Sequence, residues 1–352
     1  MTFDIDTTAP VLVTGATGYV AGWLVQALLD AGATVHAAVR DPDDAAKVKH
    51  LVDMAADAPG DIRFFRADLL APGSYGAAME GCGVVFHTAS PFSTSVKDPQ
   101  TELIDPAVNG TRNVLEQANQ TGSVTRVVLT SSCAAIYTDA KDCAAAPGGR
   151  LSEEVWNTTA SLDYQPYSYS KTLAERAAWE IARAQDRWRL VVVNPSLVMG
   201  PAMHDKPTSE SVNILRQAGD GTFRIGAPRL GIGMVDVRDL AQAHVAAGFV
   251  EGAEGRHIIS AHDTDILELV LQLRERFGAE YPLPKRALPK AMMWLMAPFV
   301  GLDRRFVAAN VNVAFRSDNS KAVRALGLSY RPMRETMEDM FAQMVAAGAF
   351  DR

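Results

Sequence analysis

A turn punctuated by glycines lies near the start of the chain, at residues 11–21, between an aliphatic run and a segment with helical periodicity. Gly15 would let the chain turn at positive φ, Gly18 would leave room for a phosphate near the backbone, and the small Ala21 would let the helix pack close to the strand. The free N–H groups at the start of such a helix attract a diphosphate. The sequence therefore predicts a dinucleotide-binding turn, with simple packing of small residues as the alternative.

Short apolar strands alternate with helical segments over the first half of the chain. This alternation predicts an α/β fold with a doubly wound parallel sheet of the Rossmann type, whose ligands bind beyond the carboxyl ends of the strands. We expect strands at 34–39, 62–65, 83–89, 126–130 and 190–193, and helices at 45–54 and 105–119.

The sequence pattern changes after Gly200. Residues 201–228 are rich in proline, glycine and serine, and the run at 234–241 is expected to return to the sheet and lead into a helix. From about residue 263 the chain is mostly helical. We therefore expect a Rossmann domain made of residues 1–200 and 233–262, and a smaller, mostly helical substrate lobe made of residues 201–232 and 263–352.

Charge and composition argue against several classes of protein. The chain has 352 residues and a formal net charge of −7, which gives no indication of a basic surface for nucleic acids or anionic lipids. No apolar run reaches the roughly 20 residues that cross a membrane, and the acidic N-terminus lacks a signal-peptide pattern. The three cysteines and the histidines have no metal-ligand spacing. We expect a cytoplasmic monomer or homodimer with no metal site and no nucleic-acid or membrane partner.

The second expected strand ends at Arg40, where dinucleotide-binding folds contact the ribose 2′ position. An arginine there pairs with a 2′-phosphate, and Lys47 lies one helical reach further on, which favours NADP over NAD. Alternatively, the neighbouring aspartates pair with both cations and form an ordinary solvated surface. Asp68 ends the third strand, where its carboxylate either meets the adenine amino group or caps the next helix.

Tyr167 and Lys171 lie four residues apart at the start of an expected helix, so their side chains share one face. A phenol ordinarily has a pKa of about 10, and a nearby ammonium group favours the phenolate, which brings the phenol closer to the acid–base range. Ser131 and Ser132 follow the fifth expected strand. A serine hydroxyl there can hold a carbonyl oxygen while the tyrosine donates a proton, although both serines can instead cap a turn.

These motifs occur in a fixed order over about residues 10 to 260, at 13–21, 39–42, 67–69, 85–91, 129–132, 167–175, 194–201 and 235–239. In order and spacing they resemble those of the extended short-chain dehydrogenases/reductases. The resemblance is greatest to the group of dihydroflavonol, cinnamoyl-CoA and aldehyde reductases. The remaining C-terminal residues match this group only loosely.

The resemblance implies a role for each matching position. Tyr167 would donate the proton in carbonyl reduction, Lys171 would hold the nicotinamide ribose and lower the tyrosine pKa, and Ser132 would bind the substrate oxygen. The NADP(H) contacts that it implies are Gly15, Thr17, Gly18, Tyr19 and Val20 for the pyrophosphate, Arg40 and Lys47 for the 2′-phosphate, Asp68 and Leu69 for adenine, Thr88, Ala89 and Ser90 for the ribose, and Pro195, Ser196 and Val198 for the nicotinamide.

The expected substrate is a small carbonyl compound, an aldehyde or a ketone, reduced in a reaction that is reversible as alcohol dehydrogenation. Phe92, Tyr137, Tyr164 and Met203 could line its pocket or could equally belong to the core. Tyr137 stands where dihydroflavonol reductases carry an amide, which argues against a flavonoid substrate. The alternative functions are a nucleotide-sugar epimerase or dehydratase, against which Arg40 argues, and a non-catalytic dinucleotide sensor, against which Tyr167 and Lys171 argue.

Overall fold

The computed structural model describes residues 5–90, 96–203 and 209–350. The strands are β1 Val11–Thr14, β2 Thr34–Val39, β3 Asp61–Arg66, β4 Val84–His87, β5 Arg126–Thr130, β6 Arg189–Pro195, β7 Leu197–Met199, β8 Gly231–Asp236, β9 Gly255–Ile259 and β10 His262–Asp265. The α-helices are α1 Tyr19–Asp30, α2 Ala45–Asp57, α3 Gly76–Met79, α4 Asp105–Gln120, α5 Asp142–Ala145, α6 Pro166–Arg183, α7 Glu210–Gly219, α8 Val237–Phe249, α9 Ile266–Leu271, α10 Arg274–Phe277, α11 Lys290–Met296, α12 Arg304–Asn310, α13 Ser320–Leu326 and α14 Met333–Ala346. Shorter turns of helix are η1 Gln100–Ile104, η2 Cys133–Ala135, η3 Pro147–Gly149 and η4 Ala297–Val300.

Seven strands form the main sheet in the order β3-β2-β1-β4-β5-β6-β9, and every neighbouring pair in it is parallel. The strand order reverses between β1 and β4, which is where sheets of this kind bind ligands. The predicted doubly wound Rossmann fold is therefore confirmed, and the carboxyl ends of β1 and β4 become the first place to look for a site.

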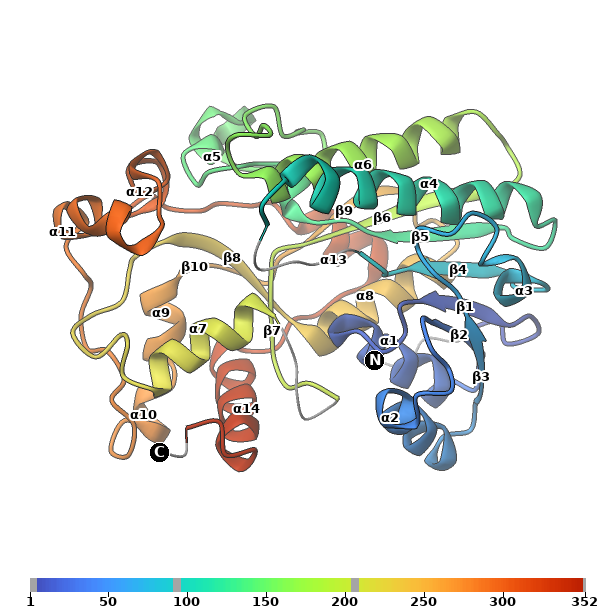
Figure 1. Cartoon of the computed structure of the whole chain (residues 1–352), viewed down its shortest axis with the longest axis horizontal. Helices are drawn as coiled ribbons and strands as arrows, with labels where there is room; N and C mark the ends of the chain where they lie inside the picture. Colours follow the sequence, from blue (N-terminus) through green and yellow to red (C-terminus); the bar gives the residue numbers. More distant parts are fainter. Residues whose placement is uncertain (1–4, 91–95, 204–208, 351–352) are drawn as a thin grey trace.

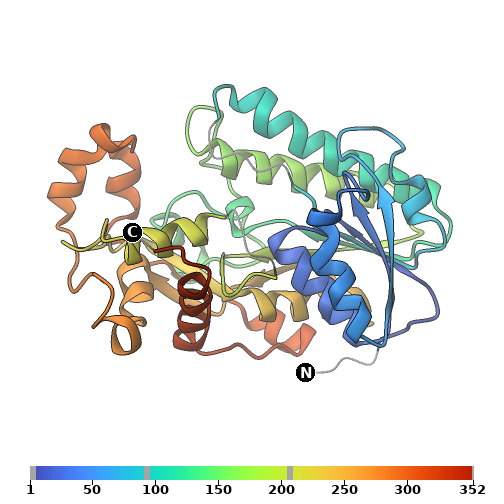
Figure 2. The ribbon, with the colours of Figure 1, turned by 60° about the horizontal axis from the view of Figure 1, so that its bottom comes forward.

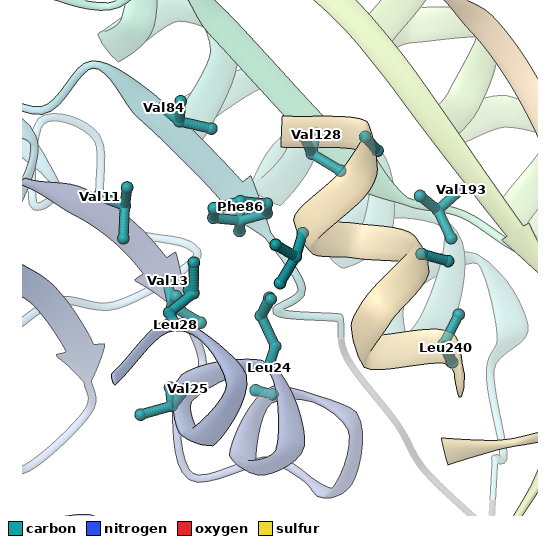
Figure 3. Close-up of a cluster of buried hydrophobic side chains, with 14 of the residues drawn as sticks. Val11, Val13, Leu24, Val25, Leu28, Val84, Phe86, Val128, Val193 and Leu240 are labelled. Atoms are coloured by element: carbon teal, nitrogen blue, oxygen red, sulfur yellow. The ribbon is translucent and has the colours of Figure 1, made fainter. Parts of the chain in front are cut away.

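Helices cover both faces of the main sheet because side chains alternate along each strand. Val13 points to the face where α1, α2, α8 and α13 pack, and Leu12 points to the opposite face, where α3, α4 and α6 pack. Figure 3 shows the first cluster, in which Phe86 of β4 lies among Leu24 of α1, Leu240 of α8 and the valines of the sheet. With both faces covered, the carboxyl ends of the strands are left to bind ligands.

The glycine turn between β1 and α1 has the backbone that the sequence predicts. Gly15 has a φ of +64°, and a Cβ placed on it would lie 3.1 Å from the Cα and Cβ atoms of Ala89. Gly18 is the N-cap of α1 and has no side chain to block the helix end. The turn therefore places the N-terminus of α1 beside the segment that follows β4. The turn and that segment approach each other so closely at Gly15 that position 15 has little room for a side chain.

A separate three-stranded sheet lies beside the main one, in the order β10-β8-β7. Our expectation that residues 234–241 return to the main sheet is wrong, because β8 pairs with β7 and β10, and β9 takes the place beside β6. A short apolar run indicates a buried strand but not its partners, which are chosen by contacts far away in the chain.

The C-terminal part is mostly helical, as predicted, and α7, α9 and α14 pack on the small sheet around Leu215, Leu269 and Phe341. In the small sheet, β7 comes from residues 1–200, which we assign to the Rossmann domain, and β10 begins at the expected boundary between residues 262 and 263. The proposed division into domains therefore stays a prediction. No helix in the described ranges is long and apolar enough to span a bilayer.

Candidate active site

Four strands of the main sheet end at the same edge and place polar residues there. Thr14 ends β1, Ser90 lies just beyond β4, Ser132 lies just beyond β5, and Ser196 follows β6. Ser196 is fixed by its backbone N–H, which donates to the carbonyl oxygen of Ile259 at 3.1 Å. Parallel strands thus gather residues that lie far apart in the sequence, which is the arrangement that the sequence reading required.

Thr14 joins the ends of β1 and β4. Its hydroxyl oxygen lies 3.1 Å from the backbone nitrogens of Thr88 and Ala89, which donate to it, and 2.9 Å from Nδ1 of His87. Thr88 in turn donates its hydroxyl to the carbonyl oxygen of Thr14 at 2.5 Å. Burial lowers the pKa of His87 to about 3, and the nearby Lys171 charge acts in the same direction. His87 is therefore a neutral, hydrogen-bonded core residue that fixes the segment expected to line the ribose.

Ser132, Tyr167 and Lys171 converge at this edge. Tyr167 and Lys171 lie in the first two turns of α6, and the Lys171 Nζ is 5.8 Å from the centre of the Tyr167 ring. The Ser132 side chain lies near enough to Tyr167 to lower the tyrosine pKa. The Ser132 oxygen accepts from the backbone N–H of Ala134 at 3.1 Å, so its own O–H is left to donate. Two motifs that lie far apart in the sequence thus occupy one place.

Lys171 also reaches the cofactor side of the edge, because its Nζ donates to the Ser90 hydroxyl at 2.7 Å. Burial lowers the pKa of Lys171 to about 8, while the Glu175 carboxylate opposes this shift. The Tyr167 ring is 41% exposed, yet the protein around its hydroxyl raises the tyrosine pKa, and the nearby Ser132 side chain works against that rise. Tyr167 is therefore a protonated phenol near neutral pH, within reach of solvent and of a charged amine.

A buried polar network that sequence reasoning missed lies beneath α6. The Glu175 carboxylate accepts hydrogen bonds from the Ser131 hydroxyl at 2.5 Å, from the Asn194 amide at 2.8 Å and from the Arg256 guanidinium at 2.6 Å. Glu175 is only 1% exposed, and Arg256 lies over the Trp156 ring at 4.0 Å. The network ties α6 to β5, β6 and β9, so it fixes the helix that carries Tyr167 and Lys171.

One pattern in the sequence could have pointed to this network. Glu175 follows Lys171 by four residues, on the helix face that is turned toward the sheet, where a glutamate needs a partner. The partners themselves come from strands whose positions the sequence does not give.

Arg40 and Lys47, predicted for the 2′-phosphate, lie exposed beyond β2. Asp41 and Asp43 pair with Arg66 at 2.8 and 2.7 Å, so they do not neutralise Arg40 as the alternative had it. Lys47 does pair with Asp44, at 2.8 Å. Within the described ranges, the Arg40 side chain has no ion pair, which leaves its charge available to an anion.

The residues predicted to touch adenine are held by a turn after β3. Asp68 is exposed, and its carboxylate accepts the backbone N–H of Leu70 at 2.9 Å, so it closes a turn rather than capping a helix. Leu69 packs against α4, where a Cβ on Gly110 would lie 2.4 Å from the Leu69 side chain. The Asn113 amide donates to the Leu69 carbonyl oxygen at 3.0 Å, which fixes this turn against α4.

The segment after β7 crosses the start of α1. The Tyr19 hydroxyl donates to the Gly200 carbonyl oxygen at 2.6 Å, and the Trp23 indole donates to the Pro201 carbonyl oxygen at 2.7 Å. Met203 lies against α1, because a Cβ on Gly22 would be 3.4 Å from its side chain. The Tyr19 side chain is thus committed to this crossing, which leaves its backbone N–H for a pyrophosphate.

The predicted substrate-pocket residues divide into three cases. Phe92 lies outside the described residues. Tyr164 is buried, its hydroxyl donates to Asp139 at 2.8 Å, and the Arg305 guanidinium covers its ring at 3.8 Å, which favours the packing alternative. Tyr137 is partly buried and packs against a core cluster that includes Phe315, with ring centres 5.1 Å apart, which also favours the packing alternative.

A family model described as the NAD dependent epimerase/dehydratase family matches residues 11–258. The chain belongs to this family. The match begins at the first residue of β1 and ends within β9, so it covers the main sheet and the converging residues described above. The resemblance to extended short-chain dehydrogenases/reductases is confirmed.

Several reductases are similar to this chain over nearly its whole length. The chain is 38% identical to cinnamoyl-CoA reductase CAD2 from Medicago truncatula over 338 residues, which cover 94% of this chain and 95% of that protein. It is 32% identical to the bifunctional dihydroflavonol 4-reductase/flavanone 4-reductase from Malus domestica, over 96% of this chain and 89% of that protein. These alignments extend beyond the family model into the C-terminal lobe.

Solved structures agree with this assignment. The structure of Gre2 from Candida albicans in complex with NADPH superposes with a TM-score of 0.77 and 28% identity, covering 96% of this chain and 99% of Gre2. The fold therefore matches that of a family member that holds NADPH. These relatives support the prediction of an oxidoreductase and of NADP(H) as its cofactor.

Proposed function

We propose that this chain is an NADPH-dependent reductase of aldehyde or ketone carbonyls, reversible as an alcohol dehydrogenase. The observation that carries the proposal is the convergence of Ser132, Tyr167 and Lys171 at the carboxyl edge of the main sheet. The named activity of the cinnamoyl-CoA and flavonoid reductases and the NADPH bound by Gre2 support the reaction and the cofactor. Its place in the cytoplasm and its state as monomer or homodimer stay predictions.

The residues at the edge fit a dinucleotide. A side chain at Gly15 would fill the narrow space beside Ala89, and α1 presents its free N–H groups at that place. Arg40 offers a guanidinium for a 2′-phosphate, which NADP has and NAD lacks. Thr88, Ala89 and Ser90 would then line the ribose, and the residues after β6 would support the nicotinamide.

The chemistry follows from the positions of three side chains. NADPH, when bound, supplies the hydride that adds to the carbonyl carbon. The Ser132 hydroxyl would hold the carbonyl oxygen, and the Tyr167 phenol would donate its proton to that oxygen, giving the alcohol. The Lys171 ammonium, held by Ser90 at 2.7 Å, would stabilise the phenolate that remains.

An epimerase or dehydratase acting on nucleotide sugars is the second candidate, since the family name includes both reactions. Such enzymes usually retain NAD, and the unpaired charge of Arg40 argues for a 2′-phosphate instead. The named relatives at 30% identity or more are reductases, which also favours carbonyl reduction.

A substrate panel tests the proposal. Purified protein should oxidise NADPH in the presence of at least one aldehyde or ketone from a panel of aliphatic, aromatic and thioester carbonyls, and should use NADH less well. Tyr167→Phe should lower kcat by about 10²–10⁴-fold, because the phenol that donates the proton is lost. The matched control is Tyr169→Phe on the same helix, which should keep full turnover.

Two results would contradict the proposal. The absence of NADPH oxidation with every carbonyl on the panel would remove the reductase function. Full turnover by Tyr167→Phe would show that another group donates the proton.

A further inference from the structure

Exposed apolar side chains gather on one hairpin of the lobe. Of the twelve large hydrophobic residues that are exposed in the described part of the chain, six lie between residues 292 and 302, on α11, on η4 and in the turn that follows. Phe299 is 83% exposed, and Leu295 is 59% exposed. The six are Met292, Trp294, Leu295, Met296, Phe299 and Leu302. A group of exposed apolar side chains on one short segment marks a surface that another body covers.

The hairpin projects from one end of the molecule. Figures 1 and 2 both show α11 and α12, in orange, side by side at the end opposite β3 and α2. Pro298 and Gly301 shape the tip, where Gly301 has a φ of +71°. The apolar side chains on α11 and η4 are therefore carried on a protrusion and not in a groove.

The inner side of the hairpin has its own core. Ala297, Val307 and Val311 are buried together, and Met293 and Leu230 pack against them. Apart from Trp294, on which Arg304 of α12 stacks, the exposed residues are absent from this core, so the packing of the hairpin does not explain their exposure.

The charge of the hairpin is opposite to that of the chain. Residues 285–305 contain five basic residues and one acidic residue, whereas the whole chain has a net charge of −7. The five basic residues are Lys285, Arg286, Lys290, Arg304 and Arg305. Arg304 stacks on the exposed Trp294 at 4.2 Å, so positive charge lies directly beside apolar surface.

We propose that the α11–α12 hairpin docks on an anionic membrane surface. Its apolar side chains would enter the boundary between headgroups and acyl chains, and the exposed Lys285 and Arg304 would meet the lipid phosphates. Aromatic and leucine side chains beside arginine and lysine are the composition of segments that lie on a bilayer without crossing it. The described helices include none that could span a bilayer, which agrees with surface binding alone.

A second copy of the chain fits this patch less well. Two such patches facing each other would bring the basic residues of both copies together, with Asp303 as the single acid of residues 285–305 to offset them. Like charges held close across an interface oppose association. The charge therefore selects an anionic surface. The proposal departs from our expectation, drawn from the whole-chain charge, that the chain has no membrane partner.

The test measures vesicle binding, which is independent of the proposed reductase activity. Full-length protein is sedimented with vesicles of phosphatidylcholine alone and with vesicles that contain equal parts of phosphatidylglycerol. The protein should bind the anionic vesicles, high salt should weaken this binding, and the Trp294 fluorescence should shift to the blue. Trp294→Phe should remove that shift.

Variants of the hairpin locate the binding. Leu295→Glu with Phe299→Glu should weaken binding at least about tenfold, because two apolar anchors are lost. Lys285→Gln and Arg304→Gln should each weaken it about fivefold. The matched control Val52→Glu, at an exposed apolar position on α2, should bind like wild type.

Three results would overturn the proposal. One is the absence of binding to anionic vesicles, and another is binding that the hairpin variants leave unchanged. The third is self-association, measured by sedimentation, that Phe299→Glu abolishes while vesicles have no effect, which would make the patch an interface between copies. Thermal unfolding of each variant checks that the fold is retained. The charge variants and the fluorescence shift keep the test valid if Leu295→Glu with Phe299→Glu fails to fold.

Discussion

The carboxyl edge of the main sheet and the α11–α12 hairpin differ in which side chains they bury. A charged side chain is buried near the edge, whereas apolar side chains are exposed on the hairpin. Beneath the edge, the Glu175 carboxylate is 1% exposed and accepts hydrogen bonds from Ser131 after β5, from Asn194 of β6 and from Arg256 of β9. On the hairpin, the Phe299 ring is 83% exposed and flanked by basic residues. A buried charge persists only when partners satisfy it, and exposed apolar surface persists when another body covers it. The first region holds the proposed catalytic residues, and the second is the proposed docking surface.

The largest expected effect would break the network beneath the edge. Glu175→Ala leaves Arg256 buried without its partner, so the free energy of unfolding should fall by about 3–5 kcal/mol. Glu175→Gln should cost less, because its amide can still accept a hydrogen bond from Arg256. Urea unfolding followed by circular dichroism measures both.

The control is Glu180→Ala on the exposed side of α6, where Glu180 pairs with Arg112 at 2.7 Å. An exposed pair of this kind contributes at most about 1 kcal/mol. Equal losses for Glu175→Ala and Glu180→Ala would mean that the buried network does not hold α6.

The next effect concerns the hydrogen bonds that join α12 of the hairpin to residues 139 and 140, which follow β5 and η2. Asn310 of α12 donates to the buried Asp139 at 2.7 Å and accepts from the backbone N–H of Ala140 at 2.7 Å. Asn310→Ala leaves Asp139 with a missing donor and should lower the free energy of unfolding by about 1–3 kcal/mol. Urea unfolding measures the loss, and limited proteolysis should cut the hairpin faster.

Lys290→Ala serves as the control, because the Lys290 amine donates to the Ala308 carbonyl oxygen within the hairpin at an exposed site. Its effect should stay within about 0.5 kcal/mol. A stable Asn310→Ala variant with an uncut hairpin would show that the two regions are joined by other contacts.

A smaller effect distinguishes the two basic residues beyond β2. Arg40→Asp should change the preference for NADPH over NADH by about tenfold or more, because it removes an unpaired guanidinium and adds a negative charge. Lys47→Asp should change it less, since Lys47 is already paired with Asp44 at 2.8 Å. Steady-state kinetics with both cofactors measure kcat/KM, and an unchanged preference in Arg40→Asp would contradict the 2′-phosphate assignment.

A further effect is a pH dependence that comes from Lys171. Its pKa in the folded protein is about 8, below the ordinary lysine value, so the unfolded chain binds more protons above pH 8. The free energy of unfolding of wild type should therefore rise, relative to Lys171→Met, as the pH increases from about 8 to about 10. Lys49→Met, at an exposed position on α2, is the control, and a difference that falls with pH would contradict the pKa.

The catalytic candidates could be found from the sequence because their signals are local. The spacing of Tyr167 and Lys171 places both on one helix face, and a serine pair after an apolar strand lies at a strand end whatever the rest of the chain does. The glycine turn is local as well, because Gly15 needs its positive φ within the turn itself. These patterns and the alternation of strands and helices led to the correct fold.

Tertiary structure decided which strands pair and which side chains contact each other, because local sequence patterns do not encode these partners. It placed β8 in the small sheet, gave Glu175 its partner Arg256 from β9, and committed the Tyr164 hydroxyl to Asp139. It also left apolar side chains of α11 exposed beside a group of basic residues. The net charge of the whole chain is an average and does not reveal such a local group. The physical reason is that periodicity tells which side of an element is apolar, whereas the element that covers that side is set by contacts between residues far apart in the sequence.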